Sequence, residues 1–117
     1  QRFPYGSVGT GVAVDDIRAT CDLFRPVYDR SEGADGFVSI EVSPGAARDA
    51  GRTRTEARQL WKLVERPNLM VKIPGTMEGA PVIREVLAEG ININVTLLFS
   101  IESYARVAEA YVEALAE

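Results

Sequence analysis

Histidine is absent from the 117 residues, and cysteine occurs once, at Cys21. Without histidine, the chain lacks the most common metal ligand and the usual general base, which excludes Ser–His and Cys–His catalysis. A single cysteine cannot form a disulfide within the chain. Cys21 falls on the apolar side of a helical pattern, which predicts a buried thiol in a reducing, cytoplasmic setting. Any chemistry must therefore use lysine, carboxylates, hydroxyls and amides.

Basic runs and long apolar stretches are missing as well. The 13 Lys and Arg residues and 17 Asp and Glu residues give a net charge of −4, which argues against nucleic-acid binding. No apolar stretch approaches the roughly 18 residues of a membrane span, and no signal-peptide pattern follows Gln1. The composition, 46% hydrophobic and 26% charged, is that of a globular protein. We expect one domain over residues 1–117.

Helical and strand periods alternate along the chain. The first predicted helix covers residues 14–28, and the predicted strands cover residues 37–42, 69–73 and 91–99. Further helices fill the two gaps between strands and the end of the chain, so the order is α-β-α-β-α-β-α. This order predicts a parallel sheet with right-handed crossovers. Residues 1–11 are glycine-rich without a clear period, and we expect a loop or a disordered lead-in there.

Local signals mark the ends of the later helices. Thr53 and Glu56 have the spacing of a capping box, which predicts a helix start at Thr53. Pro81 suits the first turn of the next helix, and Gly90 suits the position just after its end. Ser100 is the predicted N-cap of the last helix.

Each predicted strand has one apolar face and one face with polar groups, because side chains alternate along a strand. The polar faces carry Glu41, Lys72, Asn94 and Thr96, all in the later part of their strands. A doubly wound open sheet would bury both faces under helices. A barrel covers only the outside with helices and carries its active site at the carboxyl ends of the strands. The pattern therefore favours an α/β barrel with these four groups at one mouth.

Lys72 lies between two apolar neighbours, Val71 and Ile73. Burial would disfavour its ammonium form, and a neutral lysine amine is the nucleophile that forms Schiff bases with carbonyl substrates. The alternative is a lysine at a strand end that extends into water.

The other candidates also have structural alternatives. Glu41 would then be a solvated carboxylate, and Asn94 and Thr96 would hydrogen-bond each other or the backbone. Thr76 would be a turn residue or a helix cap.

Three segments resemble transaldolases, most closely the longer, bacterial-type subfamily. They are VSIEVSP (38–44), RPNLMVKIPGT (66–76) and EGININVTLLFS (89–100), and the similarity runs from about Asp15 to Glu117 with order and spacing intact. The resemblance implies part of a TIM (β/α)8 barrel and a class I aldol mechanism. It implies transfer of a three-carbon dihydroxyacetone unit between sugar phosphates, in the non-oxidative pentose phosphate pathway, without metal or organic cofactor.

The resemblance also implies residue roles. The Schiff-base lysine of the family matches Lys72, and the glutamate that positions its catalytic water matches Glu41. The asparagine and threonine that hold substrate hydroxyls and that water match Asn94 and Thr96. Thr76, at the end of the lysine segment, is a further candidate for substrate binding.

Parts of the family pattern are not present in the sequence. A full barrel of this kind needs about 250 residues, and the family's first-strand aspartate, its Thr/Ser-Asn-Pro segment and its phosphate-binding arginine and serine have no match. We therefore expect an internal piece, strands three to five, that is inactive in isolation. Two alternatives stay open: a related Schiff-base aldolase, such as a fructose-6-phosphate aldolase, and a non-catalytic fragment that self-associates through its open sheet edges.

Overall fold

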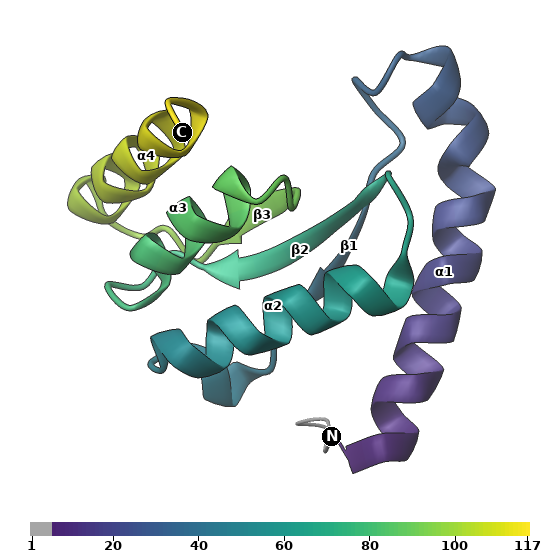
Figure 1. Ribbon diagram of the computed structural model, residues 1–117, viewed down its shortest axis with the longest axis horizontal. Helices are drawn as coiled ribbons and strands as arrows, with labels where there is room; N and C mark the ends of the chain where they lie inside the picture. The colour runs from purple at the N-terminus through teal and green to yellow at the C-terminus, as the bar shows by residue number, and fades with distance from the viewer. Residues whose placement is uncertain (1–5) are drawn as a thin grey trace.

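The fold is a three-stranded parallel sheet whose strands alternate with helices (Figure 1). The computed structural model describes the backbone of residues 6–117 and the side chains of residues 12–117. The elements are α1 (Gly6–Arg30), β1 (Val38–Glu41), the short 3-10 helix η1 (Pro44–Ala46), α2 (Ala50–Val64), β2 (Leu69–Pro74), α3 (Gly79–Ala88), β3 (Ile93–Thr96) and α4 (Ile101–Leu115). The predicted order α-β-α-β-α-β-α is confirmed, as is the parallel sheet.

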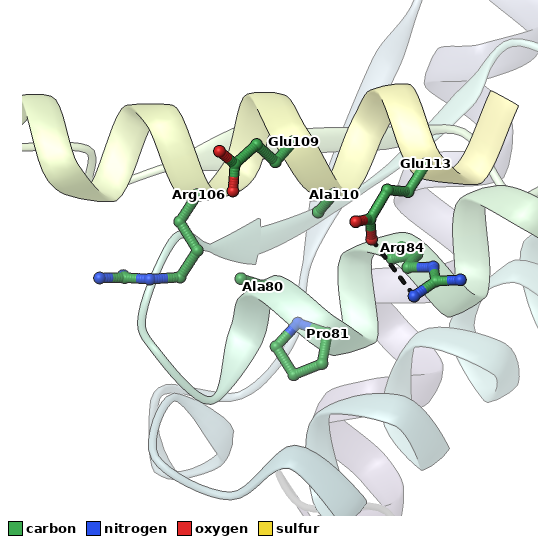
Figure 2. Close-up of a pocket in the computed structure, with 7 residues that line it drawn as sticks. All are labelled: Ala80, Pro81, Arg84, Arg106, Glu109, Ala110 and Glu113. Carbon is green, nitrogen blue, oxygen red and sulfur yellow. Dashed lines mark ion pairs between the residues drawn. The ribbon is translucent and has the colours of Figure 1, made fainter. Parts of the chain in front are cut away.

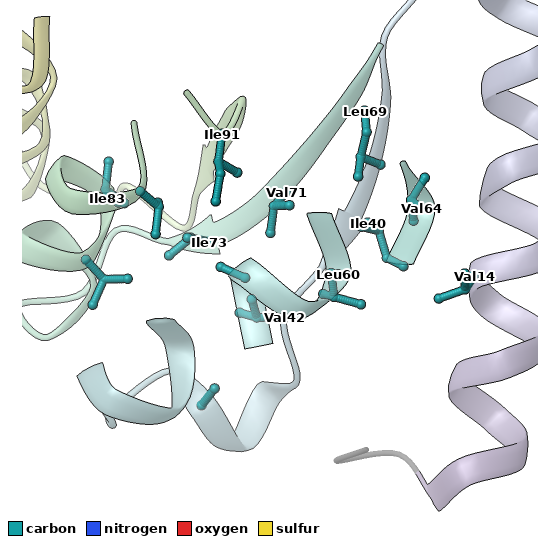
Figure 3. Packing of buried hydrophobic residues seen from close by; sticks show 14 of the residues in the cluster. Val14, Ile40, Val42, Leu60, Val64, Leu69, Val71, Ile73, Ile83 and Ile91 are labelled. Atoms are coloured by element: carbon teal, nitrogen blue, oxygen red, sulfur yellow. The ribbon is translucent and has the colours of Figure 1, made fainter. Parts of the chain in front are cut away.

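The core lies on one face of the sheet, against α1, α2 and α3 (Figure 3). In β2, the side chains of Leu69, Val71 and Ile73 all point to this face and are fully buried. Burial of each such side chain contributes at most about 1.5–3 kcal/mol. Helix α4 adds to the edge of this layer by packing against α3. The apolar strand faces predicted from the alternation are thus the faces that the helices cover.

Two predicted boundaries are wrong at the ends of elements. Residues 6–11, expected as a loop, form the first turns of α1, while residues 1–5 lie outside the described residues. Each glycine disfavours a helix by about 1 kcal/mol. The glycine-rich sequence therefore did not predict that α1 begins this early. The third strand was predicted to reach residue 99 but ends at Thr96. Leu97 has a φ of 59°, in the left-handed region, and this turn breaks the extended chain.

The capping box predicted at Thr53 is also wrong. Helix α2 begins at Ala50, and its N-cap is Asp49, which accepts a hydrogen bond from the Arg52 backbone N–H at 2.9 Å. Thr53 lies inside the helix, where its hydroxyl donates to the Ala46 carbonyl at 2.7 Å. Glu56 contacts the same loop, so tertiary hydrogen bonds use both side chains of the apparent motif.

The predicted C-terminal end of α3 and the predicted start of α4 are confirmed. Gly90 has a φ of 84° and follows Glu89, the C-cap of α3. Its N–H donates to Leu87 O and the next N–H, of Ile91, donates to Val86 O, which is the hydrogen-bond pattern of a Schellman motif. Ser100 caps α4 by accepting from Ser103 N at 3.1 Å.

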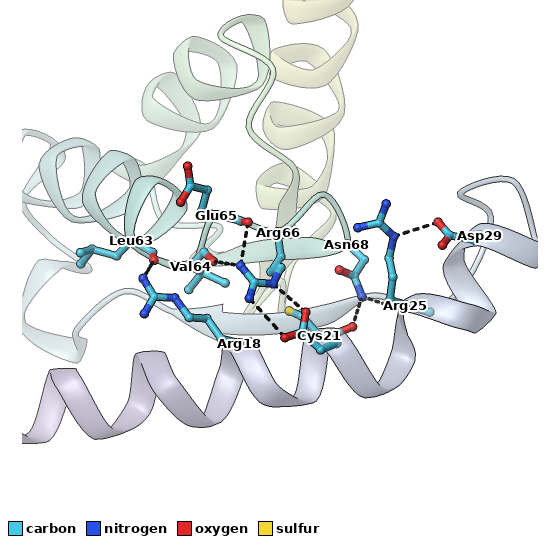
Figure 4. A network of polar contacts seen from close by, with 11 residues as sticks. Arg18, Cys21, Arg25, Asp29, Leu63, Val64, Glu65, Arg66 and Asn68 are labelled. Atoms are coloured by element: carbon cyan, nitrogen blue, oxygen red, sulfur yellow. Dashed lines mark hydrogen bonds and ion pairs between the residues drawn. The ribbon is translucent and has the colours of Figure 1, made fainter.

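Asn68 attaches α1 to the start of β2 (Figure 4). The side chain is fully buried, and its amide donates to the carbonyls of Cys21 and Gly36 at 2.9 and 3.0 Å. Cys21 is itself fully buried, as predicted, and burial raises the pKa of its thiol. Arg66 reinforces the attachment through a two-nitrogen contact with the Asp22 carboxylate.

We expect replacement of Asn68 by alanine to lower the free energy of unfolding by about 2–3 kcal/mol, because two buried carbonyls would lose their donor. Asn68→Asp should cost more, since a carboxylate would face the same two oxygens. Asn92→Ala is the control: Asn92 also donates to two carbonyls, of Pro67 and Leu69, but is only half-buried. Urea unfolding of the three variants tests this ranking. An Asn68→Ala variant no less stable than Asn92→Ala would contradict it.

Helices α2 and α3 are joined by a ladder of two ion pairs. Arg54 Nη2 lies 2.8 Å from Glu85 Oε1, and one turn later Arg58 Nε lies 2.9 Å from Glu89 Oε2. Hydrogen bonds from Arg54 and Arg58 hold the pKa values of Glu85 and Glu89, respectively, below the ordinary value of 4.5. Each pair is partly exposed and screened by solvent, so its contribution to stability is small.

The ladder should make stability acid-sensitive. A carboxylate whose pKa is lowered by folding contributes stability above its unfolded pKa, near 4.5, and this contribution disappears as the pH falls through the lower folded pKa. The double variant Glu85→Gln/Glu89→Gln should therefore have a lower melting temperature than the unmodified chain at pH 7, and this difference should disappear as the pH falls from 4.5 through the lowered folded pKa values. Glu109→Gln, at an exposed position on α4, should show no such difference. A difference in melting temperature that does not change with pH would contradict a contribution of these two ion pairs to acid sensitivity.

No helix in the described part of the chain combines the length and apolar character needed to cross a bilayer.

Candidate active site

Glu41, Lys72 and Asn94 form a row across the sheet. The strand register pairs Glu41 of β1 with Lys72 of β2, and Lys72 with Asn94 of β3. Their neighbours along each strand point into the helix-covered core, so by alternation these three side chains project from the opposite face. The convergence predicted from the sequence is thus present for a carboxylate, an amine and an amide.

Lys72 lies beside Glu41, with Nζ 3.8 Å from Oε2. Val71 and Ile73 are fully buried as expected, but the Lys72 side chain is 35% exposed and that of Glu41 is 46% exposed. The expected burial of Lys72 is therefore only partial, because no described helix covers this face. A separation of 3.8 Å is too long for a hydrogen bond and lies within the range of an ion pair. Both side chains are partly exposed, so water can bind next to the amine.

Asn94 reaches across β2 to the first strand. Its Nδ2 donates to Ser39 Oγ at 3.1 Å, although Ser39 is opposite Met70 in the register and two residues before Glu41. This hydrogen bond fixes the Asn94 amide next to Lys72. Ser39 was not among the predicted site residues. Its position on the same strand face as Glu41 was the available signal, but the contact depends on the register across three strands.

The two predicted threonines lie apart from this row. Thr96 follows Asn94 by two residues on the same strand face, opposite Pro74, and is half-buried. Thr76 lies in the loop after β2, where its hydroxyl donates to Ala47 O at 2.8 Å and accepts from Gly79 N at 3.0 Å. These bonds join two loops and support the interpretation of Thr76 as a turn residue, while the N-cap of α3 is Glu78. Its role in substrate binding stays a prediction.

Backbone hydrogen bonds fix the carboxyl ends of the strands. Val42 N donates to Lys72 O at 3.1 Å, and Gly75 N donates to Thr96 O at 2.8 Å. At Gly75 an added Cβ would lie 2.3 Å from Leu98 Cδ2, so a larger residue there would require the Leu98 side chain to move. These hydrogen bonds hold the backbone at the carboxyl ends of the strands that carry the polar groups. Catalysis requires such fixed positions of the reacting side chains.

The row can act as a nucleophile with an adjacent proton carrier. Lys72 is a primary amine, Glu41 can accept or deliver a proton through a water, and Asn94 can donate to a substrate hydroxyl. The described residues contain no group of three or more His, Cys, Asp or Glu side chains that could hold a metal ion.

A groove between α3 and α4 is separate from this row (Figure 2). Its walls are helical, and it carries charges of both signs, including Arg106 and Glu109. Arg84 crosses it to pair with Glu113 at 3.2 Å. The ion pair occupies part of the groove and stabilises the packing of α4 on α3.

Comparison with known proteins gives consistent matches. The family described as transaldolase/fructose-6-phosphate aldolase matches residues 6–116. The transaldolase of Thermobifida fusca is 57% identical over 100 residues, which cover 86% of this chain and 27% of that protein. The transaldolase of Mycolicibacterium smegmatis is 53% identical over 104 residues, covering 89% and 28%. Transaldolase 2 of Nostoc punctiforme is 54% identical over 113 residues, covering 97% and 30%.

The chain spans a little over a quarter of the length of these relatives. Its three parallel strands alternating with helices are the arrangement of part of a TIM barrel. The family match covers nearly the whole chain and includes every residue of the row. The chain therefore belongs to the transaldolase/fructose-6-phosphate aldolase family.

Proposed function

We propose that this chain supplies the Schiff-base lysine and its neighbours to a transaldolase, which transfers a three-carbon dihydroxyacetone unit between sugar phosphates. The observation that carries the proposal is the row in which Lys72 stands between Glu41 and Asn94, within a family match over residues 6–116. Relatives named transaldolase at 50–57% identity support it. The reaction belongs to the non-oxidative pentose phosphate pathway, and the proposed location is the cytoplasm.

The proposed reaction begins with attack of the Lys72 amine on the ketose carbonyl. Loss of water gives an imine, which withdraws electrons from the bond between the α- and β-carbons of the substrate. A base takes the proton of the β-hydroxyl as this bond breaks, an aldose phosphate leaves, and the three-carbon unit stays on Lys72 as an enamine. The enamine carbon then attacks the carbonyl of a second aldose phosphate, and water hydrolyses the new imine. This sequence needs neither a metal nor an organic cofactor.

Each neighbour has a role in this proposal. Glu41, whose Oε2 lies 3.8 Å from Lys72 Nζ, holds the water that carries protons to and from the carbinolamine and the enamine. Asn94 and Thr96 hold substrate hydroxyls and this water from the next strand. Thr76 would contribute through its remaining lone pair only, because its donor and one acceptor site are used within the loops.

The nearest alternative is an aldolase that releases dihydroxyacetone. The enamine would then be protonated and hydrolysed instead of attacking an aldose phosphate, and the description of the matched family includes both activities. A non-catalytic alternative is a fragment that associates through its sheet edges. Among the described strands, β1 and β3 each pair on one side only, which favours association.

We expect borohydride to trap a substrate-derived adduct on Lys72 in the presence of fructose 6-phosphate. Hydride adds to the imine carbon and leaves a stable secondary amine, which intact mass and peptide mapping detect. The test uses this chain in place of the matching 100 residues of the Thermobifida fusca transaldolase, so that the remaining barrel is present. The chain contains one other lysine, Lys62, which is exposed on α2.

Lys62 provides the matched control. Lys72→Ala should abolish the adduct of this chain, and Lys62→Ala should leave it unchanged. A folded chimera without an adduct on Lys72 would reject the proposal and favour the non-catalytic fragment. An adduct without transfer to an added aldose phosphate, but with release of dihydroxyacetone, would favour the aldolase.

Glu41→Gln should lower kcat by about 10²–10⁴-fold, because glutamine keeps the shape but cannot carry the proton. The Lys72 adduct should still form, since the amine remains. Glu102→Gln, at an exposed position on α4, is the control and should leave kcat unchanged. Steady-state kinetics of the chimera measure both, and a Glu41→Gln variant with unmodified kcat would remove Glu41 from the reaction.

A further inference from the structure

Glu56 is a buried carboxylate on α2, on the far side of the sheet from Lys72. It is 5% exposed, and three hydrogen bonds satisfy it. Oε2 accepts from the Ser43 backbone N–H at 2.7 Å, and Oε1 accepts from the Ser43 hydroxyl and from Arg52 Nε, both at 2.8 Å. A buried carboxylate is costly, and an apolar side chain could fill such a helix position at lower cost. The hydrogen-bond partners of Glu56 should therefore indicate why a carboxylate occupies this buried position.

The contacts of Glu56 lie at the end of the strand that carries Glu41. Ser43 is two residues after Glu41 and is 3% exposed. Between them, Val42 donates its N–H to the Lys72 carbonyl at 3.1 Å. The backbone just beyond Glu41 is thus fixed at two successive residues, once by the Lys72 backbone and once by Glu56.

The first turns of α2 bind the same loop at further points. Arg52 Nη2 lies 3.2 Å from Ser43 Oγ, and Thr53 donates to Ala46 O at 2.7 Å. Residues 52, 53 and 56 share one side of the helix, because positions three and four apart are neighbours. The Glu41 side chain has an ion-pair contact with Lys72 at 3.8 Å and is otherwise largely exposed. Its position therefore depends on the backbone more than on side-chain packing.

We propose that Glu56 is a positioning residue that holds the end of β1, through the Ser43 N–H, so that the Glu41 carboxylate stays beside Lys72. This inference rests on the proposed function of Lys72 and Glu41. Loss of the acceptor releases Ser43 and lets the Glu41 backbone shift, and a misplacement of about 1 Å can cost about 10²-fold in rate. Holding Ser43 does not require the charge of Glu56: glutamine can accept the same N–H and donate to the Ser43 hydroxyl, although its amide nitrogen cannot accept from Arg52 Nε.

Four variants in the chimera separate positioning from charge. Glu56→Ala should lower kcat about 10²-fold with KM changed less than about two-fold, because Glu56 touches no substrate. Glu56→Gln should keep most of kcat. Ser43→Ala removes only the hydroxyl and should also keep it. Ser43→Pro removes the N–H, at a residue whose φ of −60° suits proline, and its ring carbon also displaces the Glu56 carboxylate, so it should lower kcat at least as much as Glu56→Ala.

A double-variant cycle separates positioning from simple destabilisation. If Glu56 acts through Glu41, then Glu56→Ala should have no further effect on kcat in the Glu41→Gln background. A purely structural defect would lower both backgrounds equally. Glu85→Ala is the matched control: it breaks the Arg54 ion pair without touching the Ser43 loop and should leave kcat unchanged. Melting curves fix a temperature at which all variants are folded.

Amide hydrogen exchange of the 117-residue chain provides a readout independent of activity. The Ser43 amide should be protected in the unmodified chain and in Glu56→Gln, and should exchange faster in Glu56→Ala. Equal protection in all three, equal kcat in Glu56→Ala and the unmodified chimera, or additive losses with Glu41→Gln would each overturn the inference. Absence of a Lys72 adduct would reject the proposed function, and the exchange comparison would still decide whether Glu56 holds Ser43.

Discussion

The parallel register of three strands determines the geometry of the candidate site. Because Glu41, Lys72 and Asn94 are opposite one another in that register, one lateral row brings together an amine, a carboxylate and an amide from distant parts of the chain. A shift of one residue in any strand would turn its polar side chain into the helix-covered core. The fully buried side chains of β2 therefore fix the direction of Lys72 as well as stabilising the sheet.

Much of the fold could be predicted because its signals are local. Alternation in the strands and the helical period between them predicted the order of elements, and Gly90 and Ser100 predicted the ends of two helices. The errors arose where tertiary contacts or backbone turns decide. Thr53 and Glu56 have the spacing of a capping box but bind the loop after β1, and the left-handed turn at Leu97 ends a strand that the apolar pattern would extend.

The candidate site shows the same difference between features set by local sequence and features set by tertiary contacts. Strand alternation is enough to assign Glu41, Lys72 and Asn94 to one face, so their convergence could be predicted without coordinates. The hydrogen bond between Asn94 and Ser39 could not, since it depends on the order of three strands. The burial of Lys72 was overestimated because its neighbours in the sequence lie on the opposite face of the strand, so their burial says little about the lysine. Val71 and Ile73 are fully buried while the lysine side chain between them stays 35% exposed.

The side chains of a site on an exposed sheet face have few packing contacts. Their positions therefore depend on contacts that hold the backbone beneath them. Here two hydrogen bonds, of Glu56 to Ser43 and of Thr53 to Ala46, bind helix α2 to the loop after β1. A third, of Thr76 to Ala47, joins that loop to the loop after β2. The backbone can thus be held in place while the amine and carboxylate remain accessible. This arrangement explains why α2 and the loop after β1 carry buried polar residues that have no part in the proposed chemistry.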